Sequence, residues 1–284
     1  MTISVIGKKK QVKKSFEELL VDLTTSSSEK VRYNAARVLG EMGDSKAVEP
    51  LIDVLRNDKN GSVRLYAARA LGELGDSKAT EYLIESLRED RNVDVRVRAA
   101  RALGRLGGKI VVEPLVEALN DENPQVCITA TDALIEIGDV TTDALIASLT
   151  HEKVNVRCDA TRALGEIGNK KAVDHVIKML YDEWVNVRIY AVTSLGKLND
   201  VKAVPALIEV MKNEKENELV RAGAAAALGV LRDQRALLPL RELIMNAEEL
   251  GELEDTALKS FKKIMAANWQ SIPGASIQKK AATV

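Results

Sequence analysis

Apolar residues along this chain follow a helical rhythm, and the rhythm returns at a nearly constant interval. In the segment 31–42, the positions Val31, Ala35, Val38 and Met42 are spaced i, i+4, i+7 and i+11, as on one face of a helix. The segment begins with a Val-Arg pair, and the corresponding position recurs every 30 to 33 residues, at Val31, Val63, Val95, Val126, Val156, Val187, Val220 and Leu253. A repeat of this length predicts a solenoid of stacked two-helix units.

The first helix of each unit is predicted to bend near its start. In the segment 44–57, Asp44 follows a glycine and can accept hydrogen bonds from the free N–H groups of the opening turn. One apolar stripe runs along this helix, at Ala47, Val48, Leu51, Ile52 and Leu55. Proline recurs at one position of the first helices, at Pro50, Pro114, Pro205 and Pro239. Because proline lacks an N–H group and fixes φ, we expect a short first turn followed by a bend.

The second helices carry signals at both ends and one in the middle. An asparagine that can cap the first turn recurs at Asn60, Asn92, Asn123 and Asn217. Residues suited to a left-handed closing position stand at Gly43, Gly75, Gly107, Gly138, Gly168 and Asn199. A further glycine recurs inside the helices, at Gly40, Gly72, Gly104, Gly165, Gly196 and Gly229. Because an interior glycine costs about 1 kcal/mol relative to alanine, its recurrence predicts that a neighbouring helix approaches closely.

The recurring residues also resemble a known family. The columns Val-Arg, Ala-Ala, Ala-Leu-Gly and Gly-Asp-x-Lys-Ala are similar to the short HEAT-like repeats named after phycobilisome lyases, over residues 13–266. The resemblance implies an all-α, right-handed α–α superhelix of about eight two-helix repeats, with the second helices on the concave side. That family includes bilin lyase subunits, iron-dependent deoxyhypusine hydroxylases and scaffolds without chemistry. We expect a single solenoid over 12–267 and flexible segments at 1–11, which is basic, and at 268–284.

Composition favours an all-helical protein with an aliphatic core. Aromatic residues make up 3% of the chain, whereas hydrophobic residues make up 46%. The 41 basic and 42 acidic side chains nearly cancel, so the net charge of −1 gives no overall attraction to nucleic acid or to an anionic membrane. Cys127 and Cys158 are expected to pack as small apolar residues. Since no signal peptide or membrane-length apolar run is visible, we expect a cytoplasmic protein with no membrane contact.

Arginines fall into two groups with different expected roles. One arginine is repeated in nearly every unit, at Arg32, Arg64, Arg96, Arg157, Arg188 and Arg221, and is expected to pair with loop aspartates such as Asp44, Asp76 and Asp233. The second group lies on the solvent-facing stripe of the second helices and varies between repeats. Arginine and tyrosine are frequent anchors of protein interfaces. The candidate partner-binding residues on the concave face are Arg37, Tyr66, Arg69, Arg98, Arg101, Arg105, Arg162 and Tyr190.

Two alternatives remain open for these candidates. The arginines of the stripe could instead form a solvated face in which they pair with Glu41, Glu73 and Glu166 one turn away. Trp184, which replaces a capping residue in a turn, is a secondary candidate for docking a partner, unless Tyr181 or a nearby loop covers it.

Catalytic chemistry finds little support in the sequence. The histidines are His151 and His175, too few in this register for the iron sites of the hydroxylases, and we expect no metal or other cofactor. No phosphate-binding glycine loop or catalytic triad is visible. Arg98, Arg101 and Arg162 could hold the propionates of a tetrapyrrole, which keeps a bilin-lyase-like role as the alternative. Interleaved acids argue against nucleic acid. The sequence therefore favours a non-catalytic scaffold for a protein partner.

Overall fold

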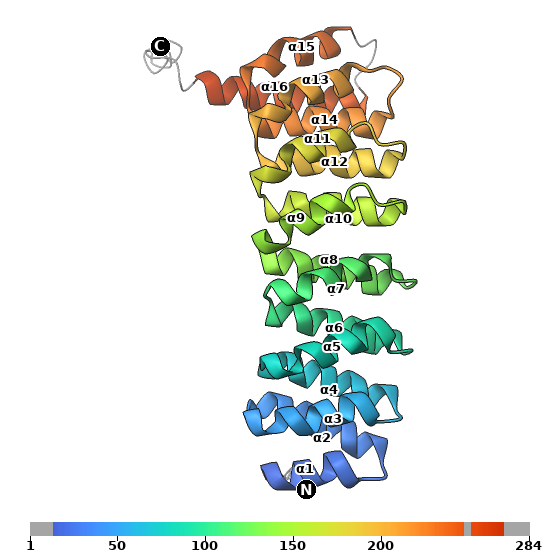
Figure 1. The fold of residues 1–284 in the computed structure, drawn as a ribbon. Coiled ribbons are helices and arrows are strands. Elements are labelled where there is room, and N and C mark those ends of the chain that lie inside the picture. Colours follow the sequence, from blue (N-terminus) through green and yellow to red (C-terminus); the bar gives the residue numbers. More distant parts are fainter. Residues whose placement is uncertain (1–13, 247–250, 270–284) are drawn as a thin grey trace, which may run out of the picture. The chain divides into compact units, whose positions relative to one another are not determined.

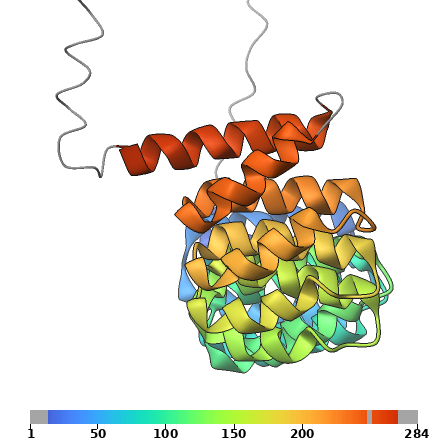
Figure 2. The same cartoon turned by 90° about the horizontal axis from the view of Figure 1, so that it is seen from above.

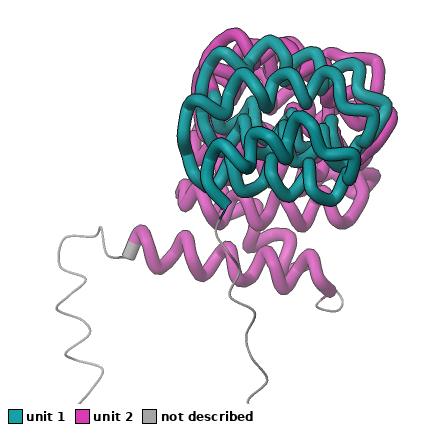
Figure 3. Tube along the Cα trace, turned by 90° about the horizontal axis from the view of Figure 1, so that it is seen from below, with its two compact units in different colours: residues 1–106 teal, residues 107–284 magenta. Residues whose placement is uncertain are grey.

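The chain folds into helices throughout its described part. The computed structural model describes residues 14–246 and 251–269, and all regular structure in these ranges is α-helix or short 3-10 helix. Packing divides the chain into two units, residues 1–106 and 107–284 (Figure 3). The segment 1–11 and nearly all of 268–284, both predicted to be flexible, lie outside the described residues. None of the described helices is long and apolar enough to span a bilayer.

Unit 1 is a stack of helix pairs. Its helices are α1 (Phe16–Thr25), α2 (Glu29–Met42), α3 (Val48–Asn57), α4 (Gly61–Leu74), α5 (Thr80–Glu89) and α6 (Val93–Leu106). The second helices pack in sequence, α2 against α4 and α4 against α6, and each first helix packs on the second helix that follows it (Figure 1).

Unit 2 continues the same pattern. Its helices are α7 (Val112–Glu117), α8 (Pro124–Ile137), α9 (Thr142–Ser148), α10 (Val154–Ile167), α11 (Val173–Met179), α12 (Val185–Leu198), α13 (Val204–Lys212), α14 (Glu218–Leu231), α15 (Leu237–Met245) and α16 (Glu252–Trp269). The second helices α8, α10, α12, α14 and α16 contact one another in that order. Figure 2 shows α15 and α16 side by side at the C-terminal end of the unit. Both units therefore confirm the prediction of an all-α solenoid of two-helix repeats.

The short first turn predicted for the first helices is confirmed as a 3-10 turn. Residues Ser45–Ala47 form this turn, and the carboxylate of Asp44 accepts from the Lys46 N–H at 2.9 Å. The α-helix α3 then begins at Val48, with Pro50 inside its first turn. The apolar stripe predicted for this helix is buried along its whole length.

The close approach predicted for the interior glycines is also confirmed. A Cβ atom added at Gly40 or at Gly72 would lie 2.7 Å from the Cβ of Ala70 or Ala102, respectively, on the next second helix. One detail of the predicted apolar face is wrong, because Met42 is 47% exposed. The buried face of α2 is centred on Ala35, Ala36, Leu39 and Gly40, and Met42 lies at the end of the helix, next to the left-handed Gly43.

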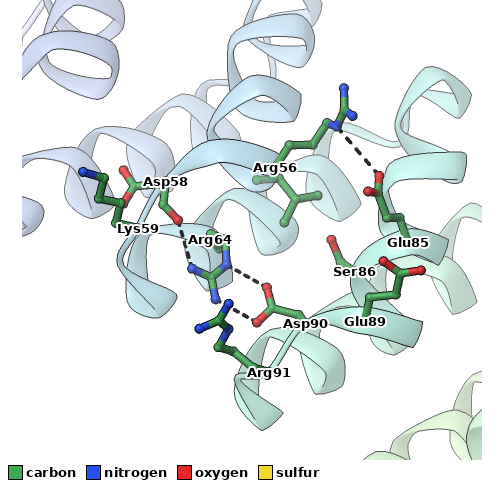
Figure 4. A pocket seen from close by; sticks show the side chains of 10 residues that line it. Arg56, Asp58, Lys59, Arg64, Glu85, Ser86, Glu89, Asp90 and Arg91 are labelled. Carbon is green, nitrogen blue, oxygen red and sulfur yellow. Dashed lines mark hydrogen bonds and ion pairs between the residues drawn. The ribbon is translucent and has the colours of Figure 1, made fainter.

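Arginines at the start of the second helices tie successive repeats together. Nε and Nη2 of Arg64 donate to the two carboxylate oxygens of Asp90 at 2.7 and 2.8 Å, and Nη1 donates to the carbonyl of Asp58 at 2.9 Å (Figure 4). Equivalent ion pairs join Arg32 to Asp58, Arg157 to Asp182 and Arg188 to Glu216. Each arginine thus holds the turn of its own repeat and the turn of the next.

The structural pairing of this arginine column with loop aspartates is therefore confirmed, but the three aspartates given as examples are wrong. Asp44 and Asp76 cap the 3-10 turns, and Asp233 binds Arg235. The arginines pair instead with acids in the turn between the two helices of the following repeat. Asp58, the partner of Arg32, lies two residues before the capping residue Asn60.

Candidate functional site

One type of cavity recurs with the repeat and belongs to the architecture. One example, of about 480 Å³, lies beside the Arg64–Asp90 pair and includes Arg56 and Glu85 (Figure 4). A cavity with the equivalent residues, 32 positions earlier, surrounds the Arg32–Asp58 pair. A third lies beside Glu216, the partner of Arg188. Because these hollows accompany the ion pairs that join repeats, their recurrence marks them as gaps between successive turns.

Two other cavities lie on the second helices. One, in unit 1, is lined by Arg69, Gly72, Glu73, Arg98, Arg101, Ala102 and Arg105. The other, in unit 2, is lined by Asp121, Glu122, Pro124, Cys127, Ile128, Asn155, Cys158, Asp159, Asn186, Ile189 and Tyr190. Five of the eight residues that the sequence singles out line these two cavities, whereas Arg37, Tyr66 and Arg162 do not.

The five lining residues are Arg69, Arg98, Arg101, Arg105 and Tyr190. Tyr66 lies one helical turn before Arg69 on α4 and is not itself a lining residue. Its ring stacks on the ring of Tyr33 in α2, with centroids 5.2 Å apart and an interplanar angle of 19°. Sequence reasoning missed Tyr33, although two tyrosines in adjacent second helices of a chain so poor in aromatic residues were a usable signal.

Several arginines of the stripe are neutralised by acids, as in the alternative left open above. Arg37 pairs with Glu41 and Arg69 with Glu73, each at 2.7 Å and one turn along the same helix. Arg162 does not pair with Glu166, the acid one turn further along its helix. Its guanidinium lies 3.4 Å from Asp132 of the preceding second helix and 4.0 Å from Asp159.

Glu166, the acid expected to neutralise Arg162, instead forms an ion pair with Lys197 of the next second helix. Arg37 and Arg69 thus pair with the acid one turn further along the same helix, whereas Arg162 contacts Asp132 of the preceding second helix and Asp159 one turn earlier on its own helix. Side chains of this length reach both kinds of partner, so spacing along the helix alone did not distinguish them.

The cavity in unit 1 concentrates positive charge. Arg98, Arg101 and Arg105 are spaced i, i+3 and i+7 on α6, so they share one face of that helix. Together with the Arg69–Glu73 pair on α4 they line a hollow of about 140 Å³. Within the part of the chain that the structure describes, these three arginines of α6 take part in no ion pair. The lining therefore carries four guanidinium groups against one carboxylate.

The packing of the repeats explains why this hollow forms. Gly72 of α4 and Ala102 of α6 both line it, and the two helices approach closely there, since a Cβ atom on Gly72 would be 2.7 Å from that of Ala102. This close approach brings Arg69 of one helix beside the arginines of the next. Gly72, which the stacking of the helices requires, thus also helps to bring the charged side chains of the two helices together.

The cavity in unit 2 has a different character. It measures about 460 Å³ and is walled by apolar groups that include Ile128, Ile189 and the two thiols. Burial raises the pKa of Cys158 to about 11 and also raises the pKa of Cys127, so both thiols remain protonated at neutral pH. The sequence did not predict this hollow. Its signal was that Cys158 stands where the adjacent repeats carry the larger Ile128 and Ile189.

Polar groups border this second cavity. Burial raises the pKa of Asp159, against the opposing effect of the nearby Arg162 guanidinium. Tyr190 is 39% exposed. Both cysteines are free thiols. The arrangement offers a small apolar surface with a carboxyl at its edge.

Trp184 lies at the start of α12, where its backbone N–H donates to the carboxylate of Asp182 at 2.9 Å. The residue is 53% exposed. Tyr181, the residue that could cover Trp184, is also exposed, and its hydroxyl donates to Glu209 at 3.0 Å.

His151 serves the turn before α10. Its Nδ1 accepts from the Lys153 N–H at 3.0 Å, and its carbonyl accepts from Arg157 at 2.9 Å. In residues 14–246 and 251–269, no three histidine, cysteine, aspartate or glutamate side chains are grouped so that they could hold a metal ion.

Solved structures of other proteins have folds similar to that of this chain. The karyopherin Kap121p, bound to the extreme C-terminus of the protein phosphatase Cdc14p, is similar at 15% identity and a TM-score of 0.67, over 89% of this chain and 34% of that chain. Importin beta is similar at 12% identity and a TM-score of 0.64, over 88% of this chain and 41% of that chain. At these identities the likeness concerns the fold alone.

The complex of CpcE and CpcF of phycocyanin lyase from Nostoc sp. PCC7120 is similar at 24% identity and a TM-score of 0.47, over 93% of this chain and 100% of that chain. No curated protein matched the sequence. The family model for HEAT repeats matches residues 17–92, 80–150, 112–186 and 175–262. These matches cover most of the sequence and agree with the stacked helix pairs, and the chain therefore belongs to the family of HEAT-repeat proteins.

Proposed function

We propose that this protein is a non-catalytic scaffold that binds a protein partner on the exposed face of its second helices. The stacking residues recur from repeat to repeat, whereas the exposed residues of the second helices differ, as expected where one face recognises a ligand and the rest maintains the stack. Such a surface is already formed before binding, so little conformational entropy is lost when a partner docks. The karyopherin Kap121p, whose fold is similar, is itself bound to the extreme C-terminus of the protein phosphatase Cdc14p.

The observation that carries the proposal is the group of unpaired arginines in unit 1. Arg98, Arg101 and Arg105 lie on one helix face and have no acidic partner among the described residues, although most other arginines of the stripe do. Mutual repulsion of like charges is unfavourable, and an acidic partner would relieve it. In this proposal, the partner presents acidic groups to unit 1, and the protein acts in the cytoplasm without a cofactor.

A charge-reversal experiment tests this function. Arg98→Glu, Arg101→Glu and Arg105→Glu are combined in one variant, and Lys46→Glu, Lys59→Glu and Arg91→Glu in a control with the same change of charge in the same unit. Each tagged protein is used to capture ligands from native lysate. The proposal predicts a protein that is retained by the wild type and the control and lost by the arginine variant.

The same eluates distinguish the scaffold from the alternative, a bilin-lyase-like role. A bound tetrapyrrole that is retained by the wild type, in the absence of a protein partner, would favour a bilin-lyase-like role in which the arginines hold propionates. A protein retained equally by all three versions would move the interface away from the arginine face. Circular dichroism and thermal unfolding of each variant show whether the stack is intact.

A further inference from the structure

The unit 1 cavity has the size and charge of a receptor for one compact anion. Its lining brings together four guanidinium groups from two adjacent helices around about 140 Å³. The single carboxylate in the lining, Glu73, is already engaged by Arg69 at 2.7 Å. The remaining three cations carry an uncompensated charge that one monovalent carboxylate would not balance.

From this arrangement we infer that the cavity formed by Arg69, Arg98, Arg101 and Arg105 binds the phosphoryl group of a phosphorylated side chain on the protein partner. This inference rests on the proposed function and specifies the partner's chemistry. A phosphoryl group carries close to two negative charges at neutral pH and three acceptor oxygens. Arginine is well suited to it because the planar guanidinium donates paired hydrogen bonds to phosphate oxygens.

The geometry favours a phosphoryl group over an extended run of acidic residues. The arginines of α6 are spread over two turns, but their side chains border one small hollow together with Arg69 of α4. An extended acidic segment would be matched by charges distributed along several repeats. Instead, Arg37 and Arg162, which lie in other repeats, are already paired with acids.

The chain supplies a matched pair of variants for the test. Arg101→Gln removes one cation of the cavity, and Arg91→Gln removes an exposed cation of the same unit that borders the recurring cavity instead. A combined Arg98→Gln, Arg101→Gln and Arg105→Gln variant removes the unpaired charge altogether. Glutamine retains most of the side-chain length and the helix propensity.

The probes are three short peptides of one sequence, Ac-Gly-Ala-X-Ala-Gly-amide, in which X is phosphoserine, aspartate or serine. Inorganic phosphate and a single-stranded oligonucleotide are titrated in parallel. Binding to the full-length protein is followed at low salt by the amide NMR signals of α6 and by calorimetry. We expect the phosphoserine peptide to bind at least tenfold more tightly than the aspartate peptide and than inorganic phosphate. This binding should be lost in the triple variant, weakened by Arg101→Gln and unchanged by Arg91→Gln.

Equal binding of the three peptides, binding that survives the triple variant, or no binding of the phosphoserine peptide up to its solubility limit would overturn the inference. Tighter binding of inorganic phosphate or of the oligonucleotide would also overturn it, because the phosphoryl source would then not be a protein side chain. A captured partner that depends on the arginines but binds equally after phosphatase treatment would overturn this inference while leaving the proposed scaffold function intact.

Discussion

Arg64 and Asp90 form a two-point ion pair across adjacent repeats, with donor–acceptor distances of 2.7 and 2.8 Å. Their side chains are 14% and 8% exposed, so the pair is largely shielded from water. The same carboxylate accepts from the Asn92 N–H at 2.8 Å and thereby shapes the turn before α6. One aspartate thus joins the start of one second helix to the turn that leads into the next.

Removing this aspartate should destabilise the stack. Asp90→Ala leaves the guanidinium of Arg64 shielded from water and without its carboxylate, so we expect the free energy of unfolding to fall by about 3 kcal/mol. The matched control is Glu85→Ala, which removes a half-exposed partner 3.7 Å from Arg56 and should cost less than about 1 kcal/mol. Urea denaturation of both variants provides the measurement. Equal losses of unfolding free energy in the two variants would show that shielding of the Arg64–Asp90 pair from water does not contribute to stability.

The interior glycines should differ in their tolerance of a methyl group. Gly72→Ala places a Cβ atom 2.7 Å from that of Ala102 and should destabilise the protein by about 1–3 kcal/mol through overpacking. At Gly196 the nearest atoms of Ala227 are 3.5 Å away, which is an ordinary contact. Gly196→Ala should therefore be neutral or stabilising by up to about 1 kcal/mol, because alanine favours the helix. Thermal unfolding can rank the two variants, and the reverse order would contradict the packing argument.

Acid should weaken the ion-pair ladder. Burial alone would raise the pKa of Asp58, but hydrogen bonds from Arg32 and from the Asn60 N–H outweigh it and hold that pKa below its ordinary value of 3.8. A carboxyl with a lowered pKa in the folded state stabilises the fold above its unfolded pKa, and this contribution is lost as the pH falls through the folded pKa.

The free energy of unfolding should consequently decline below about pH 4. The Asp58→Asn variant lacks the titrating group, so its difference from the wild type should be largest near neutral pH and should shrink in acid. Urea titrations at several pH values measure this difference. A difference that is independent of pH would exclude Asp58 as a contributor to the acid dependence.

The thiol of Cys158 should react slowly with alkylating reagents. With a pKa of about 11, only a small fraction of the group is thiolate at pH 8. Iodoacetamide labelling, followed by mass spectrometry, should be slow in the folded protein, should accelerate as the pH rises toward 11, and should become fast after unfolding in urea. Rapid labelling of folded Cys158 at neutral pH would contradict the buried, protonated thiol.

The repeat allowed much of the fold to be predicted from the sequence. Positions such as Gly72 recur in register, and the physical requirement behind each, here a close helix approach, is the same in every copy. The partners of Arg64 and its equivalents were assigned wrongly because several loop aspartates lay at plausible distances along the chain. Only the turn geometry brings Asp90, and not Asp76, to the guanidinium.

The candidate site could be predicted in part. The spacing of Arg98, Arg101 and Arg105 places them on one helix face, so their grouping was visible in the sequence. Whether an arginine meets an acid depends on side-chain rotamers and on the neighbouring helix, which is why the pairing of Arg162 with Asp132 was missed. The cavity beside Cys158 was not predicted, because it forms where a small side chain replaces a larger one and no sequence motif indicates such a replacement.

The central claim is that the arginine face of unit 1 recognises the partner, and calorimetry with the captured protein tests it most directly. The affinity is measured for the purified wild type and for the combined Arg98→Glu, Arg101→Glu and Arg105→Glu variant. The combined Lys46→Glu, Lys59→Glu and Arg91→Glu variant is the control. We expect a loss of about a hundredfold or more for the arginine variant, equivalent to about 3 kcal/mol, and little change for the control. Equal affinities for the wild type and the arginine variant would contradict the claim that this face recognises the partner.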